Sequence, residues 1–143
     1  MTDTTRSYNS NTDGPHQRLG QIALLVRDYD EALDYFIRTL GFECIKDTVQ
    51  SETKRWVVVA PPGSTGMHVL LAKAKNDAET SRIGDQAGGR VFLFLYTDDF
   101  KTYYERLRLA GVDFTEEPRQ EAYGHVVVFR DLYGNLWDLI ERA

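Results

Sequence analysis

The most constraining feature of this sequence is that one order of elements occurs twice. In each half an apolar strand pattern leads to an aspartate that can cap a helix, and a glycine follows the helix. These residues are Asp28 and Gly41 in the first half and Asp98 and Gly111 in the second. Because both pairs are separated by the same interval, the pattern indicates an internal duplication.

Each half is expected to contain a β-α-β-β-β unit, which makes the predicted fold class α+β. Strands are predicted where apolar residues alternate or run continuously, and helices where they recur every three or four positions. The predicted strands span 19–26, 42–49, 55–60 and 67–72 in the first half, and 91–97, 112–115, 125–129 and 136–140 in the second. The predicted helices run to about 40 and 110.

The chain of 143 residues fits one domain with a hydrophobic core. Its polar N-terminal segment is interpreted as a disordered or loosely attached arm. The polar connector between the halves is either a simple link or a mobile cover over a site, with a short helical turn. The predicted division is 1–18 for the arm and 19–143 for a single domain, with module one at 19–72, the connector at 73–90 and module two at 91–141.

Composition excludes several classes of protein. A net charge of −5 gives no electrostatic basis for nucleic-acid binding. No apolar run reaches the ~20 residues of a membrane span, and no apolar signal-peptide core is present at the N-terminus. The single cysteine, Cys44, cannot form an intrachain disulfide and is typical of a reducing compartment. We therefore expect a cytoplasmic protein.

Asp138 is the residue whose local sequence most suggests a site. It lies in the apolar strand Leu-Trp-Asp-Leu-Ile, directly after a turn that contains Gly134 and Asn135. A carboxylate among large hydrophobic residues is costly unless it is paired, hydrogen-bonded or bound to a metal. The alternative is a carboxylate at the strand edge, in water or paired with an arginine.

Three stretches carry a resemblance to a known family, and together they span roughly residues 19–141. They are LGQIALLVRDYDEALDYFIRTLGFE (19–43), TDDFKTYYERLRLAGVDF (97–114) and FRDLYGNLWDLIE (129–141). In these stretches the chain resembles the vicinal-oxygen-chelate superfamily, which includes glyoxalase I, bleomycin- and fosfomycin-resistance proteins and extradiol dioxygenases. The segments RWVVVAPPGS, GGRVFLFLYTDDF and DLYGNLWDL look like a glyoxalase-like bacterial branch whose members mostly lack an assigned reaction. The resemblance implies two modules whose curled mixed sheet surrounds a cavity.

The resemblance also implies candidate metal ligands on the cavity faces of the first and fourth strands of each module. They fall on Gln21, His68 and Asp138, while the fourth position falls on Phe92. Three protein ligands and a water can form a catalytic site for a divalent metal such as Zn, Ni, Mn or Fe. Such a metal would chelate adjacent oxygens of a small substrate, with Asp138 or a nearby group moving a proton in a lyase- or dioxygenase-type reaction.

A metal-free binding protein of the bleomycin-resistance type is the alternative, because phenylalanine at position 92 cannot ligate a metal. An aromatic-lined cavity would then bind a drug-like molecule by burial and stacking. The candidate substrate-binding residues are Trp56, Phe92, Phe94, Tyr96 and His125, with Trp137 as a further aromatic candidate. The alternative is the commoner one for such residues: most aromatic residues on strands belong to the core, and a strand histidine such as His125 is more often on the surface. The apolar strands predict a homodimer, and the resemblance implies one as well, since proteins of this family often dimerise, sometimes by exchanging modules.

Overall fold

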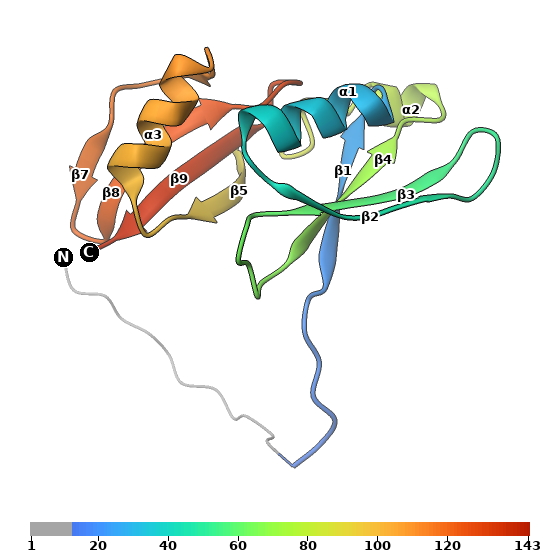
Figure 1. Cartoon of the computed structure of the whole chain (residues 1–143), viewed down its shortest axis with the longest axis horizontal. Coiled ribbons are helices and arrows are strands. Elements are labelled where there is room, and N and C mark those ends of the chain that lie inside the picture. The colour runs from blue at the N-terminus through green and yellow to red at the C-terminus, as the bar shows by residue number, and fades with distance from the viewer. Residues whose placement is uncertain (1–12) are drawn as a thin grey trace.

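The computed structural model describes residues 13–143 and contains two mixed β-sheets, each with a helix on one face (Figure 1). Module one comprises β1 (Gln21–Val26), α1 (Tyr29–Asp34), the π-helix η1 (Tyr35–Thr39), β2 (Glu43–Val49), β3 (Arg55–Ala60) and β4 (His68–Lys73). The connector contains α2 (Asp77–Thr80). Module two comprises β5 (Val91–Tyr96), α3 (Phe100–Leu109), β6 (Asp113–Phe114), β7 (Arg119–Glu121), β8 (Gly124–Arg130) and β9 (Leu136–Arg142). The predicted α+β fold of two modules is confirmed, whereas residues 1–12 of the predicted arm lie outside the described part of the chain.

The two sheets have the same plan. Their strand orders are β1-β4-β3-β2 and β5-β9-β8-β6, and β7 pairs with β8. In each sheet the first strand pairs in parallel with the last strand of its module, and the other pairings are antiparallel. The sheets do not close into a barrel, so β1 and β5 are both edge strands.

The first helix begins at its predicted cap and changes type before it ends. The Asp28 carboxylate accepts a hydrogen bond from the Glu31 amide at 2.9 Å. After Asp34 the α-helix continues as η1, in which the Leu40 amide donates to the Tyr35 carbonyl at 3.1 Å. Gly41 follows with a φ of 75°, a conformation that glycine adopts without a steric penalty.

The second helix begins one residue later than predicted. The cap is Asp99, whose carboxylate accepts from the Thr102 amide at 3.1 Å, and not Asp98. The Asp99 amide donates to the Thr97 hydroxyl, which fixes the turn before the helix. In the sequence Asp98 and Asp99 are equivalent candidates for the helix cap. The hydrogen bond from the Asp99 amide to Thr97 favours Asp99. Strand β7 was not predicted either, because its sequence Arg-Gln-Glu contains no apolar residue.

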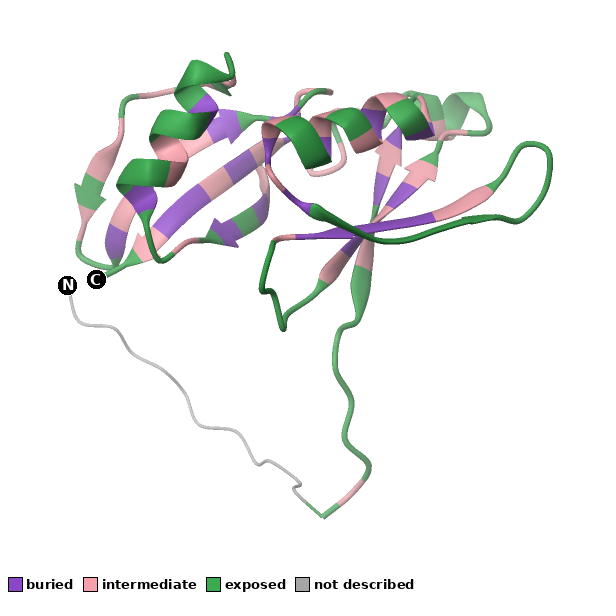
Figure 2. Cartoon of the chain, viewed as in Figure 1, coloured by how far each residue is buried: buried purple, intermediate pink, exposed green. Residues whose placement is uncertain are grey.

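The helix-facing sides of both sheets form one hydrophobic core (Figure 2). Trp137 of β9 lies at the centre of an aromatic cluster that joins the modules. Its ring centroid is 6.0 Å from that of Phe36 and 6.1 Å from that of Phe42, both in module one. It also stacks on Phe129 of its own module at 5.8 Å. The modules therefore share one core.

The connector is hydrogen-bonded to both modules through Gln86. Its side-chain amide accepts from the Leu25 amide at 2.5 Å and donates to the Ala23 carbonyl at 3.1 Å, both on the outer edge of β1. Its backbone amide donates to the Asn135 side chain at 3.3 Å, in the turn before β9. The Gln86 side chain thus satisfies two backbone groups on the edge of β1. The Gln86 backbone amide is bonded to module two.

Within residues 13–143, none of the helices has the length and apolar character needed to cross a membrane.

Candidate functional site

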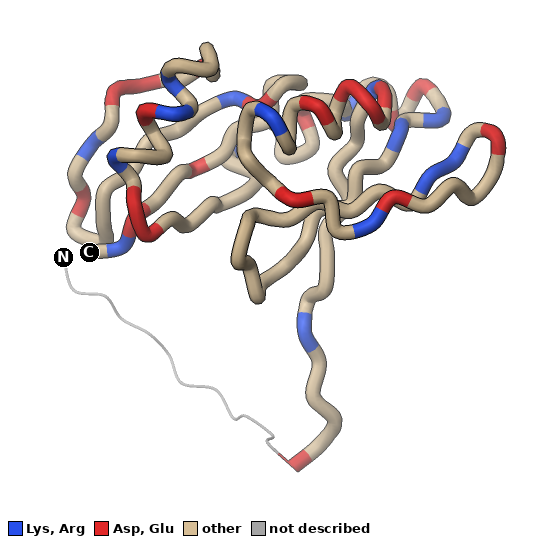
Figure 3. The backbone as a smooth tube through the Cα atoms, in the orientation of Figure 1, with Lys and Arg blue, Asp and Glu red and all other residues tan. Residues whose placement is uncertain are grey.

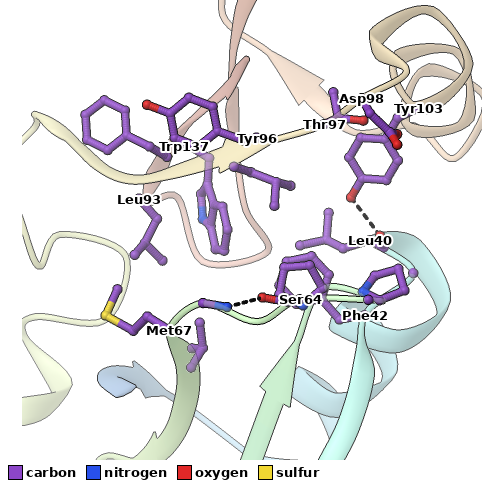
Figure 4. A pocket seen from close by; sticks show the side chains of 18 of the residues that line it. Leu40, Phe42, Ser64, Met67, Leu93, Tyr96, Thr97, Asp98, Tyr103 and Trp137 are labelled. Carbon is purple, nitrogen blue, oxygen red and sulfur yellow. Dashed lines mark hydrogen bonds between the residues drawn. The ribbon is translucent and has the colours of Figure 1, made fainter. Parts of the chain in front are cut away.

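A groove with a volume of 1160 Å³ lies between the β3–β4 loop of module one and the edge strand β5 of module two. Figure 4 shows Leu93 and Trp137 pointing from module two towards Met67 and Phe42 of module one. The loop 61–67 and strand β5 contain no charged residue, and the tube in Figure 3 is correspondingly uncoloured there. These two walls of the groove are therefore apolar, whereas the charged residues Asp98, Arg106, Glu141 and Arg142 line other parts of it.

Two aromatic side chains of β5, Phe94 and Tyr96, line this groove and are exposed. Leu93 and Leu95 face the core and are buried. Phe94 and Tyr96 face the opposite side and are 57% and 53% exposed. Because β5 is an edge strand, the groove reaches residues on both of its faces. Because Phe94 and Tyr96 are two positions apart on one strand face, they form a contiguous exposed aromatic patch, which suggests a binding surface.

The position of Trp137 depends on Asp131, which is 6% exposed. One Asp131 oxygen accepts from the backbone amides of Tyr133, Gly134 and Asn135, each at 3.0 Å. The other accepts from the Asn135 side chain at 3.2 Å and from the Trp137 indole at 3.0 Å. The sequence prediction did not single out Asp131, because an aspartate before Gly-Asn is typical of a turn. Trp137, six residues later, was the signal that could have indicated a buried carboxylate, because a buried indole N–H needs an acceptor.

The far end of the groove is polar and fixes the end of the first helix. The Tyr103 hydroxyl donates to the Leu40 carbonyl at 2.7 Å. Burial raises the pKa of Tyr103, which keeps this hydroxyl protonated as a donor. Nearby, the Glu141 carboxylate accepts from the Phe100 amide at 2.9 Å. The Arg142 guanidinium lies 4.5 Å from the centroid of the Tyr96 ring.

The structure brings together two of the three predicted metal ligands. Gln21 and His68 are direct partners on the adjacent strands β1 and β4. Asp138 belongs to the other sheet, where its strand neighbours are Phe94 and Val128. In the described part of the chain, no group of three His, Cys, Asp or Glu side chains could hold a metal ion. The described residues therefore show no cluster of charged or imidazole ligands, and the set of Gln21, His68 and Asp138 stays a prediction.

Asp138 is half-buried, and its Oδ1 atom has no hydrogen-bond partner within residues 13–143. Burial raises the pKa of its carboxyl group; Arg119 opposes this effect and Glu116 adds to it. Arg119 itself is engaged elsewhere, with ion pairs to Glu116 at 3.1 Å and to Glu121 at 2.6 Å. The carboxylate that prompted the metal prediction thus lies in an apolar strand with one oxygen unsatisfied by the chain.

The predicted substrate-binding residues are divided among several places. Phe94 and Tyr96 line the groove, as does Trp137. Trp56 lines a separate pocket of 220 Å³ on the β2–β3 hairpin. Phe92 is half-buried and packs against the core. His125 stacks on Phe100 of α3 with ring centroids 3.9 Å apart, on the helix side of the sheet. The groove therefore brings together two of the five predicted residues.

Comparisons with known proteins agree with this architecture. A protein of Shewanella frigidimarina (strain NCIMB 400) is 55% identical over 126 residues, covering 87% of this chain and 93% of the relative. The crystal structure of UcmS2 is 30% identical with a TM-score of 0.76, covering 88% of this chain and 98% of that one. TnmS3 of Streptomyces sp. CB03234 is described as an antibiotic binding protein. Its structure is 25% identical with a TM-score of 0.71, covering 90% of this chain and 98% of that one.

The matching family model extends over residues 18–139, from before β1 into β9, and includes the connector between the modules. The chain belongs to the glyoxalase/bleomycin resistance protein/dioxygenase superfamily.

Proposed function

We propose that this protein binds small planar aromatic molecules in the groove beside β5 and does so without a metal. The observation that supports this function best is the exposure of Phe94 and Tyr96 in a groove whose β5 and β3–β4 loop walls carry no charged residue. Binding would bury these rings, and burial together with ring stacking stabilises such a complex. The volume of 1160 Å³ is comparable with the ~300–1,000 Å³ of clefts that hold drug-sized ligands.

The similarity to TnmS3 supports a ligand of this type. That protein is described as binding an antibiotic, and it has the same fold at 25% identity. A binding protein also needs no complete metal-ligand set, which agrees with Phe92 in the fourth ligand position.

We expect planar aromatic probes to bind with micromolar affinity and to quench the fluorescence of Trp137. The measurement uses the variant Trp56→Phe, so that Trp137 is the only tryptophan that reports. Three anthracene-sized probes are suitable: 9-aminoacridine, 9-anthracenemethanol and anthracene-9-carboxylate. Replacing Phe94 with alanine should weaken binding by about 5- to 10-fold, because a stacking contact is lost.

The matched control is Ile45→Ala, since Ile45 is an exposed apolar residue on β2 that does not line the groove. It should leave the affinity unchanged. Failure of all three probes to bind would contradict the proposed function.

The second candidate function is a metal-dependent lyase or dioxygenase, and the pairing of Gln21 with His68 is the observation that favours it. A metal analysis of natively purified protein separates the two candidates. We expect well under one equivalent of Zn, Ni, Mn or Fe per chain. One equivalent that is lost in His68→Ala would support the enzyme instead.

We further propose that the protein is a cytoplasmic homodimer. The exposed free thiol of Cys44 is compatible with a reducing compartment. The exposed side chains of Val49 and Leu109, which do not line the groove, offer apolar surface for a partner subunit. Light scattering after size-exclusion chromatography should give twice 16.4 kDa. A mass of one chain would contradict the dimer.

A further inference from the structure

Strand β5 has backbone groups that no other strand pairs with, and these groups lie along the groove. β5 is at the edge of its sheet and pairs only with β9, while residues 93–97 line the groove (Figure 1). The Thr97 amide donates to the Ile140 carbonyl of β9 at 2.9 Å. Because successive residues of a strand direct their backbone N–H and C=O groups to opposite edges, those of Phe94 and Tyr96 point away from β9. Within residues 13–143 no other segment forms a backbone hydrogen bond with them.

The other edge strands of the described chain are protected in ways that β5 is not. Edge strands usually carry charged residues, are very short or are covered by another segment. The Gln86 side chain covers part of the edge of β1, and β2 has charged residues in its sequence Glu-Cys-Ile-Lys-Asp-Thr-Val. Strands β6 and β7 have only two and three residues. Strand β5, Val-Phe-Leu-Phe-Leu-Tyr, has no charged residue, and its register shift comes before Leu93.

An open edge of this kind fits a molecule that contains an amino acid residue in extended form. A residue placed opposite Phe94 would donate its N–H to the Phe94 carbonyl and accept from the Phe94 amide, as in an antiparallel pair of strands. Its side chain would then lie on the same face as the Phe94 ring, at a Cβ separation of roughly 5 Å. An aromatic side chain in this position would pack against Phe94, with Tyr96 next to it on that face.

We infer that the groove prefers aromatic molecules that contain an amino acid residue, and that the edge of β5 binds the backbone of this residue as an added strand. The inference rests on the proposed function, since the bound residue stacks its ring on Phe94. The two backbone hydrogen bonds fix the orientation of the ligand, and burial of the rings supplies most of its affinity. Residues 93–97 extend over roughly 16 Å, so the ligand pairs over about five residues at most.

The test uses N-acetyl-3-(9-anthryl)alanine methylamide, a single aromatic residue with an amide group on each side, and two derivatives with one extra methyl group. The first derivative has this methyl group on the nitrogen of the aromatic residue, whose N–H would donate to the Phe94 carbonyl. The second has it on the C-terminal amide, whose N–H would point away from β5. The two derivatives are isomers with the same number of methyl groups. Quenching of Trp137 fluorescence in the Trp56→Phe variant measures the affinities.

The position of the methyl group is expected to decide the affinity. The second derivative should bind within about 3-fold of the parent peptide, because it keeps both groups that face β5. The first should bind about 10- to 30-fold more weakly than the second, because one hydrogen bond is lost and the methyl group collides with the edge of the strand.

A pair of protein variants tests the same contact from the other side. Phe94→Ala and Phe94→Pro both lack the aromatic ring, but only the proline variant lacks the backbone N–H. Proline is tolerated on an edge strand where the N–H faces away from the sheet. Phe94→Pro should bind the parent peptide about 5- to 10-fold more weakly than Phe94→Ala, whereas 9-anthracenemethanol should bind both equally. Melting temperatures check that both variants fold, and if Phe94→Pro does not, the two peptide isomers still decide.

The outcomes separate this inference from the proposed function. Equal affinities of the two isomers would overturn the role of the β5 edge, while binding of 9-anthracenemethanol would leave the aromatic groove intact. Failure of the peptide and of every aromatic probe would overturn both. If the peptide binds only by separating a dimer into single chains, as measured by light scattering, the edge belongs to a second copy of the chain and the inference is wrong.

Discussion

Replacing Asp131 with alanine is expected to lower the free energy of unfolding by about 3–5 kcal/mol. The change removes the acceptor of five hydrogen bonds, and two of the donors belong to the buried side chains of Asn135 and Trp137. A buried donor left without an acceptor costs about 1–3 kcal/mol, and the cavity left by the carboxylate adds to this loss. Urea unfolding followed by far-ultraviolet circular dichroism measures the effect.

The matched control is Asp113→Asn, because Asp113 is exposed and forms only a surface ion pair with Arg130 at 3.3 Å. That change should cost less than about 1 kcal/mol. Asp131→Asn tests whether both carboxylate oxygens are needed as acceptors. Its NH2 group would face the N–H donors of Asn135 and Trp137 and could not accept their hydrogen bonds. This variant should destabilise the protein and shift the emission maximum of Trp137. Equal stabilities of Asp131→Ala and Asp113→Asn would contradict the role assigned to Asp131.

Replacing Gly84 with alanine is expected to destabilise the protein by more than about 3 kcal/mol. A Cβ atom at this position would collide with the backbone carbonyl oxygen of Tyr133 and lie 2.8 Å from its carbonyl carbon. Because both groups are backbone, neither can move away as a flexible side chain could. The φ of 79° at Gly84 adds the strain of a left-handed conformation.

Gly88→Ala isolates the contribution of this close contact. Gly88 has a similar φ of 63°, but no atom lies within 4 Å of an added Cβ. Its replacement should therefore cost only the backbone strain, about 1 kcal/mol. Thermal unfolding of the two variants side by side gives the difference. Similar melting temperatures would show that the connector can move away from the turn before β9 without a large loss.

The element order was predictable because it depends on local signals. Asp28 and Gly41 mark the ends of the first helical segment in the sequence, and both act there in the structure. The π-helical turn between them was not predictable, since nothing in the sequence Tyr-Phe-Ile-Arg-Thr distinguishes it from an α-helix. Local patterns determine where an element begins and ends, while tertiary packing determines its detailed geometry.

The candidate site was less predictable because it depends on which face of each strand meets the groove. Strand alternation alone separates Phe94 and Tyr96 from Leu93 and Leu95, their buried neighbours on β5. It could not show that His125 would stack on Phe100, since both faces of β8 carry apolar residues. The importance of Asp131 depends on an indole that reaches it only in the folded chain.

The bidentate contact of Gln86 with β1 also affects how this protein can associate with other chains. An edge strand with free amide and carbonyl groups can accept a strand from another molecule, which is a common route to aggregation. On β1 the Leu25 amide and the Ala23 carbonyl are already occupied by one glutamine side chain. An incoming strand would have to displace Gln86 from that edge. Replacing Gln86 with a shorter residue would therefore expose a site for unwanted polymerisation, even if the monomer remained folded.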